Sequence, residues 1–183
     1  LPIWFPELPH SAQSPMASVW ALGTVLNVEV PETIRIDVRG EFAKHVSAKD
    51  LILHVIGTIT SQGANFRAIE FHGETIRRMR TSGRLVLCNM AVEAGATSGM
   101  VPPDEETVSY LRQEAGVREP IPLLSPDADA PYVRTVEVDV STLDPQLACP
   151  NAVDNVVPVR EREGTKVDQV LIGSCTNGRY DDV

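Results

Sequence analysis

Long hydrophobic runs and an excess of basic charge are both missing from this sequence of 183 residues. No apolar stretch approaches the ~20 residues that span a membrane, and a start with proline at 2, 6 and 9 and no basic segment predicts no signal peptide. The 16 Lys and Arg residues against 25 Asp and Glu give a net charge of −9. Nucleic acids and anionic membranes both select basic surfaces. We therefore expect a cytoplasmic protein with no nucleic-acid partner and no membrane partner.

Cysteine is scarce, with three residues at positions 88, 149 and 175. They are far apart and odd in number, which excludes a disulfide framework and a compact zinc pattern, and no C-x-x-C pair occurs. We interpret Cys88 and Cys149 as buried small hydrophobic residues in a reducing compartment. The spacing leaves the role of Cys175 open.

Hydrophobic periodicity predicts an α/β chain. Alternation over 33–38 is typical of a half-buried strand. Ser47 with Asp50 three residues later forms a predicted capping box, and an apolar helical face follows it at Leu51, Ile52, Val55, Ile56 and Ile59. Because strands and helices then alternate along the chain, we expect the α/β class.

The remaining expected elements come in chain order. They are a short strand over 66–71, a brief polar helix over 74–80, a buried helix over 85–94 ended by Gly95, a helix capped by Asp104 with Val108 and Leu111 inward, a strand over 132–140 and a final strand over 167–172.

The most informative segment is Val170–Arg179, which reads V-L-I-G-S-C-T-N-G-R. The apolar residues predict a buried strand that is followed by a glycine-bounded turn, with the Cys175 thiol at the carboxyl end of the strand. Ligands collect at that end in open α/β sheets. Backbone N–H groups there can hold the charge of a thiolate, so Cys175 is a candidate metal or cluster ligand.

Four segments together resemble the aconitase superfamily. Gly173–Arg179 resembles its first iron–sulfur cysteine motif, and Cys88–Thr97 (C-N-M-A-V-E-A-G-A-T) resembles its Asn/Glu active-site segment. Pro102–Thr107 and Pro150–Val159 also resemble family stretches, nearest to the large subunits of 3-isopropylmalate dehydratase and homoaconitase. The resemblance covers 17–183, and its motifs stand in the family order.

The resemblance implies a three-layer α/β fold in which mixed β-sheets are flanked by helices. It divides the chain into an unmatched proline-rich segment over 1–16, an aconitase-like domain over 17–125, and the start of a second such domain over 126–183. The boundary falls among the four prolines of 119–131.

The resemblance also implies a hydro-lyase, a dehydratase or isomerase of the leucine-biosynthesis type that acts on a small hydroxy di- or tricarboxylic acid such as 3-isopropylmalate. Such enzymes use a 4Fe-4S cluster held by three cysteines, whose fourth iron binds the substrate. By this resemblance Cys175 is the first ligand, and the amide of Asn177 lies near the cluster. Asn177 as a simple turn residue is an equal alternative.

The chain lacks the C-x-x-C pair that supplies the other two family ligands. We therefore expect no intact cluster in this chain alone, and a small subunit or another chain completing the active site. The alternative is a catalytically incomplete fragment, kept as a structural or interaction module with Cys175 free. No histidine matches the family's catalytic segment.

Glu93 and Asn89 are the catalytic candidates. Glu93 lies among the apolar and small residues of 90–94, where a carboxylate needs a partner or a metal. Asn89, one helical turn earlier, shares its face, and the resemblance places Glu93 beside the open iron and its water. We expect Glu93 and Cys175 to converge on one cavity. The alternatives are a solvated Glu93 near a helix end and a structural Asn89.

Overall fold

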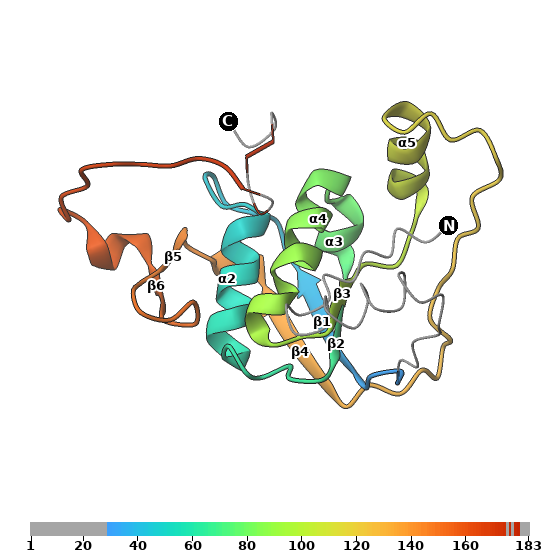
Figure 1. Ribbon diagram of the computed structural model, residues 1–183, viewed down its shortest axis with the longest axis horizontal. Coiled ribbons are helices and arrows are strands. Elements are labelled where there is room, and N and C mark those ends of the chain that lie inside the picture. The colour runs from blue at the N-terminus through green and yellow to red at the C-terminus, as the bar shows by residue number, and fades with distance from the viewer. Residues whose placement is uncertain (1–28, 175, 177, 180–183) are drawn as a thin grey trace, which may run out of the picture.

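A four-stranded parallel sheet organises the chain, of which the computed structural model describes residues 29–174, 176, 178 and 179. Its strands are β1 (Thr33–Arg39), β2 (Ala68–His72), β3 (Ser98–Met100) and β4 (Arg134–Asp139), in the order β3-β2-β1-β4 (Figure 1). Each added strand is joined through helical crossovers, as parallel pairing requires. The α/β class is confirmed.

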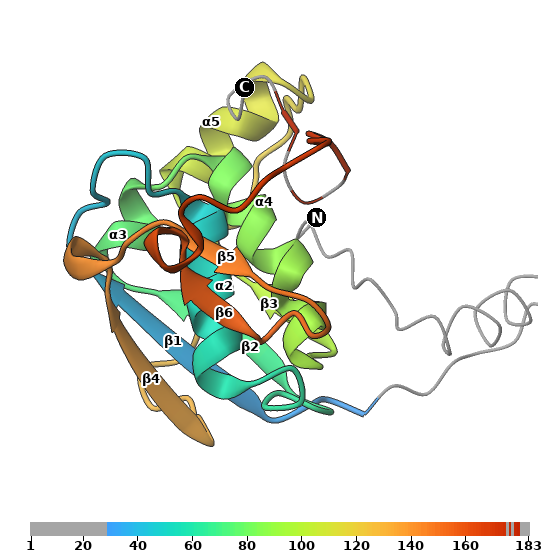
Figure 2. The same cartoon turned by 90° about the vertical axis from the view of Figure 1, so that its left-hand side faces the viewer.

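Two helices, α2 (Ala48–Ile59) and α4 (Thr81–Met90), run side by side over one face of the sheet (Figures 1 and 2). The shorter helices are α3 (Glu74–Arg78), α5 (Glu105–Gln113) and the 3₁₀ turns η1 (Ala91–Ala94), η2 (Val140–Thr142) and η3 (Val159–Arg162). The longest described helix has 12 residues. Within the described residues, no helix combines the length and apolar character needed to cross a membrane.

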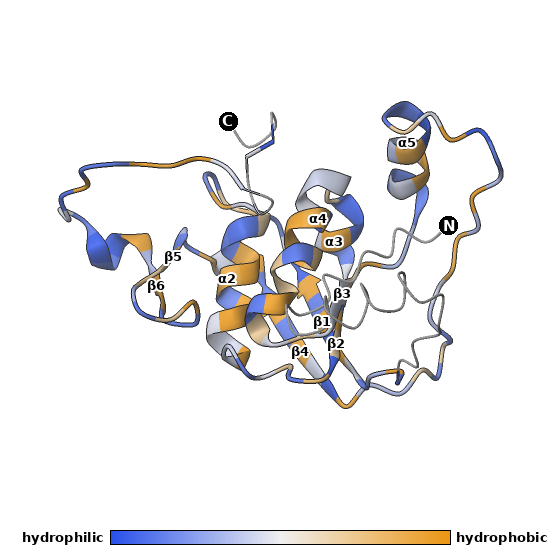
Figure 3. Ribbon diagram, viewed as in Figure 1, coloured by the Kyte–Doolittle hydropathy of each residue, from blue (hydrophilic) through white to orange (hydrophobic). Residues whose placement is uncertain are grey.

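The core lies between the sheet and these two helices. Along β1, Ile34, Ile36 and Val38 are buried and alternate with half-buried polar neighbours, as the sequence predicts. The apolar face of α2 is fully buried against them. In Figure 3 apolar and polar residues accordingly alternate along the helices and strands.

The opposite side of the sheet carries polar side chains. The Arg35 guanidinium lies 2.7 Å from the Asp37 carboxylate and 5.5 Å from the Tyr132 ring centre. The Tyr132 hydroxyl donates to the Glu70 carboxylate at 3.1 Å, and His72 Nε2 lies 3.3 Å from the same carboxylate. The two faces of the sheet therefore differ sharply in polarity.

A short antiparallel ribbon, β5 (Gln146–Ala148) with β6 (Val156–Pro158), packs on α2 (Figure 2). Gly57 permits the contact, because a Cβ there would lie 3.0 Å from Val156 Cβ. Asp154 Oδ2 accepts a hydrogen bond from Ser61 N at 2.8 Å. The ribbon is thus tied to the far end of α2.

The predicted capping box at the start of α2 is confirmed and does more than cap the helix. Asp50 Oδ2 accepts from Ser47 N at 2.7 Å and from Ser47 Oγ at 2.9 Å. Asp50 Oδ1 accepts from Gln146 N at 2.7 Å. One buried carboxylate therefore closes the first turn of α2 and anchors β5.

Asp50→Ala is expected to destabilise the protein by about 2 kcal/mol, because it removes a cap and leaves the Gln146 N–H without its acceptor. Urea unfolding measures this change. Glu105→Ala, at an exposed first-turn position of α5, is the control and should change stability by less than about 0.5 kcal/mol. Equal losses for both variants would contradict the bridging role of Asp50.

Several predicted boundaries shift in the structure. The strand expected at 66–71 spans 68–72, and the polar helix ends at Arg78. The buried helix begins at Thr81, four residues before the expected start. The α-helix ends at Met90, and the 3₁₀ turn η1 that continues it ends at Gly95 as predicted: this residue has a φ of 82°, and its N–H donates to the carbonyls of 91 and 92. The helix capped by Asp104 is also confirmed, with Val108 buried and Leu111 half-buried.

The prediction of a buried strand over 167–172 is wrong. These residues form no strand, and Val170, Leu171 and Ile172 expose 74%, 89% and 67% of their surface. A continuous apolar run predicts burial, but a strand also needs a neighbouring strand as a hydrogen-bond partner. Among the described residues no strand pairs with this segment.

The sheet extends across the predicted domain boundary at 125/126. Strand β4 follows the proline-rich 119–131 segment, yet it pairs with β1 over six residue positions. The chain therefore returns to the first sheet after the prolines. The division into 17–125 and 126–183 stays a prediction for the whole protein.

Candidate functional site

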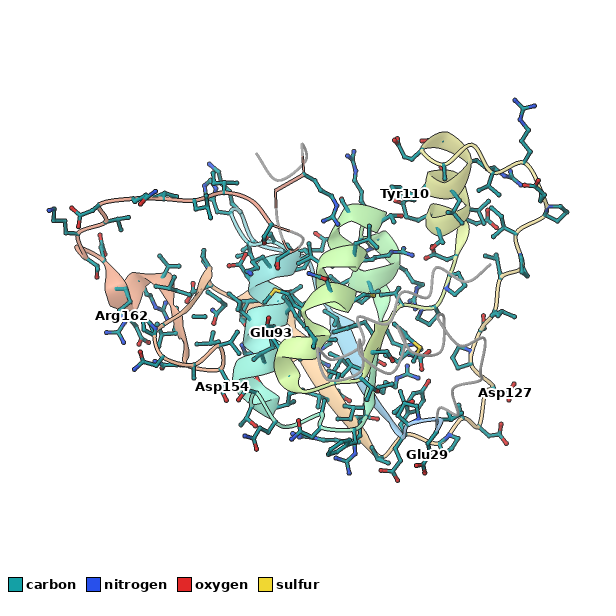
Figure 4. The ribbon with its side chains drawn as sticks, viewed as in Figure 1. Glu29, Glu93, Tyr110, Asp127, Asp154 and Arg162 are labelled. Carbon is teal, nitrogen blue, oxygen red and sulfur yellow. The ribbon has the colours of Figure 1, made fainter. Side chains whose placement is uncertain are left out.

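The catalytic candidates lie where α4 gives way to the 3₁₀ turn η1. Asn89 is half-buried in the last turn of α4, and Glu93 is exposed in η1. Figure 4 labels Glu93 near the contact between α2 and the α4–η1 segment. Both side chains are thus carried by one continuous backbone segment.

The expectation that the Glu93 carboxylate lies on a buried apolar face is wrong. The α-helix ends at Met90, and η1 has three residues per turn, so side chains three apart eclipse one another. Ala91 and Ala94 occupy the buried positions, both 0% exposed. Glu93 is exposed, so its carboxylate is accessible to a ligand from solvent.

Strand β3 packs against the end of α4 and against η1. A Cβ on Gly99 would lie 2.7 Å from Ala91 Cβ and 2.8 Å from the Cys88 carbonyl oxygen. Only glycine allows the β3 backbone to approach the end of α4 so closely. The backbone that carries Asn89 and Glu93 is therefore held against the sheet.

Lys49 approaches the same place from α2. Its Nζ lies 3.2 Å from Met90 Sδ. Burial lowers the pKa of Lys49, while the negative charges of Glu93 and Asp50 act in the opposite direction. Lys49 is not among the site residues predicted from the sequence. Its signal was a lysine in the first turn of a helix, where the helix dipole disfavours positive charge.

Cys88 and Cys149 are unsuited to hold a cluster together. Cys88 is half-buried rather than fully buried as predicted, but desolvation of its thiol still raises the pKa to about 12, so the thiol stays protonated at neutral pH. Cys149 is buried, as predicted, and its Sγ accepts a hydrogen bond from Arg162 Nε at 3.4 Å. In the part of the chain that the structure describes, no three His, Cys, Asp or Glu side chains form a metal-binding group.

Cys88 is expected to react with iodoacetamide at pH 8 at least ~10²-fold more slowly in the folded protein than in denaturant, because the thiolate is the reacting species. Peptide mass spectrometry over a time course measures the modification of each cysteine. Equal rates in the folded and unfolded protein would contradict the raised pKa.

The predicted ligand Cys175 and its companion Asn177 lie outside the described residues. Their neighbours form a tight turn, since Ser174 has a φ of 75° and Thr176 N donates to Ser174 Oγ at 3.4 Å. The turn is consistent with a cysteine loop. The convergence of Glu93 with Cys175 stays a prediction.

A separate hollow of about 800 Å³ lies beside the β5–β6 ribbon. Leu147, Cys149, Val159, Arg162 and Val167 are among the residues that line it. Neither Asn89 nor Glu93 contributes to its wall. The hollow is therefore distinct from the α4–η1 site.

Known proteins match this chain over most of its length, including the α4–η1 site. The model of the aconitase family (aconitate hydratase) matches residues 14–183. The chain is 53% identical over 169 residues to the 3-isopropylmalate dehydratase large subunit 1 of Methanopyrus kandleri, and 52% identical over 168 residues to a Methanothermobacter thermautotrophicus protein named "Probable 3-isopropylmalate dehydratase large subunit". It is 50% identical over 168 residues to a "Probable methanogen homoaconitase large subunit" of the latter organism.

Each of these alignments includes 92% of this chain but only 39% or 40% of the relative. The chain thus spans about two fifths of the length of the curated relatives it matches. The match runs through the Asn89–Glu93 segment and the cysteine loop. On this evidence the chain belongs to the aconitase family.

Proposed function

We propose that this chain forms part of the active site of a hydro-lyase that removes water from, and adds it to, a small hydroxy di- or tricarboxylic acid. The family match over 14–183 is the observation that carries the proposal. Relatives named 3-isopropylmalate dehydratase and homoaconitase favour 3-isopropylmalate or a similar hydroxy-acid as substrate.

Glu93 is the proposed proton-transfer group. In dehydration a C–H bond and the neighbouring C–O bond both break: a base takes the proton from carbon, and the departing hydroxyl needs a proton to leave as water. In hydration carbon gains a proton and the incoming water must lose one. A solvent-exposed carboxylate on a rigid backbone can give and take that proton. Asn89, on the preceding turn, is proposed to orient the substrate or the water through its amide.

A 4Fe-4S cluster is part of the proposal, but the described residues do not fit one. They contain no group of three potential ligands, and the Cys88 thiol is protonated at neutral pH. We therefore assign Cys175 as the first ligand and Asn177 as its neighbour on the Gly173–Arg179 motif alone. When bound, such a cluster supplies a Lewis-acidic iron.

The proposed partners follow from the names of the relatives. Those proteins are called large subunits, which favours a separate small subunit that completes the active site. A cytoplasmic enzyme of leucine biosynthesis agrees with the 3-isopropylmalate dehydratase relatives. Both assignments belong to the whole protein.

Iron and labile-sulfide analysis of the full-length polypeptide after anaerobic reconstitution tests the proposal. We expect about four irons per polypeptide, and the Cys175→Ser variant should lose most of them while the control Cys149→Ser keeps them. A full-length protein that binds no cluster would favour the alternative, a structural or interaction module. The 183-residue chain alone should bind no intact cluster.

A further inference from the structure

The amino edge of the parallel sheet carries exposed apolar side chains. Because the strands are parallel, the residues that precede β2, β1 and β4 meet at this one edge. Phe66, Val30 and Val133 lie there and expose 87%, 89% and 48% of their surface. These three residues form the amino-edge patch. Figure 4 labels Glu29 at the same edge, where the chain enters β1.

Hydrogen bonds join the starts of the three strands and keep the patch together. Ala68 N donates to the Glu32 carbonyl at 2.9 Å, and Val133 N donates to the Thr33 carbonyl at 3.0 Å. Arg67 Nε lies 3.4 Å from Glu32 Oε2 beside the patch. The patch therefore has an apolar centre with a charged pair at its margin, which is the composition of an interaction surface.

The backbone holds Phe66 in its exposed position. Its φ of 60° is in the left-handed region, which an aromatic residue rarely adopts. Next to it, Arg67 N donates to the Ala64 carbonyl at 2.9 Å, and Thr97 N donates to the Arg67 carbonyl at 2.8 Å. Ala64 N donates to the Ala94 carbonyl of η1 at 2.9 Å. Strain of this kind persists where the surrounding structure imposes it and is found at binding sites, so the ring is presented to a partner.

The segment that precedes the patch has the composition to cover it. Residues 17–28 read A-S-V-W-A-L-G-T-V-L-N-V and carry no charged side chain. Trp20 is the one aromatic residue among them. The family match begins at residue 14 and includes this segment. An uncharged, apolar segment of a family domain needs an apolar surface to bury its side chains against.

The same segment also has the reach to cover the patch. Trp20 lies 10 positions before Val30. A chain of that length spans ~33 Å when extended and ~15 Å as a helix, so either conformation reaches the three patch residues. Because the segment is joined to Val30, it meets the patch at an effective concentration on the order of millimolar. This favours it over a second copy of the chain or a separate protein.

We propose that residues 17–28 dock on the amino-edge patch and cover the Phe66 ring. The contact is intramolecular and apolar, and it does not depend on the proposed reaction. By covering Phe66 it braces the 61–67 loop, which is hydrogen-bonded to the η1 turn through Ala64 and Ala94.

Trp20 fluorescence reports this docking directly. The chain has two tryptophans, so Trp4→Phe leaves Trp20 as the sole indole. We expect acrylamide to quench Trp20 at least ~3-fold less efficiently in the native protein than in urea, because a packed indole is shielded from solvent. Adding Phe66→Asn should raise the native quenching at least ~2-fold, since asparagine accepts a positive φ but supplies no ring. The control Leu171→Asn, at a residue 89% exposed outside the patch, should leave the quenching unchanged.

A second patch variant and a fold measurement complete the test. Val30→Ser should raise the quenching in the same direction as Phe66→Asn, and far-ultraviolet circular dichroism should show the wild-type spectrum for each variant. A native Trp20 as accessible as in urea would overturn the inference. So would a protected Trp20 that ignores both patch variants, because the segment then packs elsewhere. Protection that increases with protein concentration would overturn it in favour of a second copy of the chain.

Discussion

Glu93→Gln in the full-length enzyme is expected to cut turnover by ~10²-fold or more, the scale of a lost general acid–base group. Glutamine keeps the size and polarity of the side chain but can neither give nor take the proton. Because Glu93 is exposed, the change should leave the thermal midpoint and the iron content unaltered. Steady-state kinetics with iron analysis on the same samples measures both effects.

A matched control is available on α5. Glu105 is likewise exposed in a helical first turn, so Glu105→Gln should retain full turnover. If Glu93→Gln also retained full turnover, Glu93 would be an ordinary solvated residue near a helix end, and its role by family resemblance would be wrong.

Arg84→Met is expected to cost about 3 kcal/mol of stability, because it removes the partner of the Asp104 carboxylate in a largely buried ion pair. Arg84 is 3% exposed. Its guanidinium donates to Asp104 Oδ1 at 2.6 Å and Oδ2 at 2.8 Å. It also donates to the carbonyls of Met79 at 2.9 Å and Arg77 at 3.0 Å. Methionine fills the space but donates no hydrogen bond, so Asp104 Oδ2 and the carbonyls of Met79 and Arg77 lose this donor.

This network also links stability to pH. Burial alone would raise the pKa of Asp104, but the hydrogen bonds and charge of Arg84 and the N–H groups of Thr107 and Glu106 lower it overall. A carboxyl with a lowered folded-state pKa stabilises the protein above its unfolded pKa of about 3.9, and that stability is lost as the pH falls through the folded value.

Urea unfolding between pH 6 and pH 2 therefore tests the Arg84–Asp104 pair. The wild type should lose stability on acidification more steeply than Arg84→Met, and the exposed α5 control Arg112→Met should follow the wild type. Parallel pH profiles for wild type and Arg84→Met would show that the pair contributes nothing to the pH dependence.

The sequence predicts structure correctly where the residues that decide it lie within one helix, strand or turn. The capping box of Ser47 and Asp50, the alternation of β1 and the Gly95 cap each depend on residues a few positions apart, and the structure confirms all three. Periodicity and cap chemistry act over that range. The α/β class followed from them.

The errors arose where a tertiary partner decides the outcome. The apolar 167–172 segment has the composition of a buried strand, but strand formation depends on a partner that sequence periodicity does not reveal. The exposure of Glu93 depends on the change from α- to 3₁₀-geometry after Met90, and no residue type marks that change. The return of β4 to β1 across the prolines is likewise a long-range event.

The sequence predicts only part of the candidate site. Glu93 and Asn89 were found through resemblance, because a carboxylate and an amide on one helix are not distinctive by themselves. Lys49 lies 44 positions before Glu93 and meets its segment only through the packing of α2 on η1. That contact exists only in the folded structure, so sequence patterns do not reveal it.

The central claim, that this aconitase-family chain serves a hydro-lyase, is tested most directly by a dehydration assay. The full-length polypeptide, loaded with iron and sulfide and mixed with its small subunit, is incubated with 3-isopropylmalate and with other small hydroxy di- and tricarboxylic acids, and the carbon–carbon double bond of the product is followed by ultraviolet absorbance and mass spectrometry. We predict formation of the unsaturated acid with loss of one water from the hydroxy-acid. A fully loaded protein that forms no unsaturated product from any small hydroxy di- or tricarboxylic acid would contradict the account.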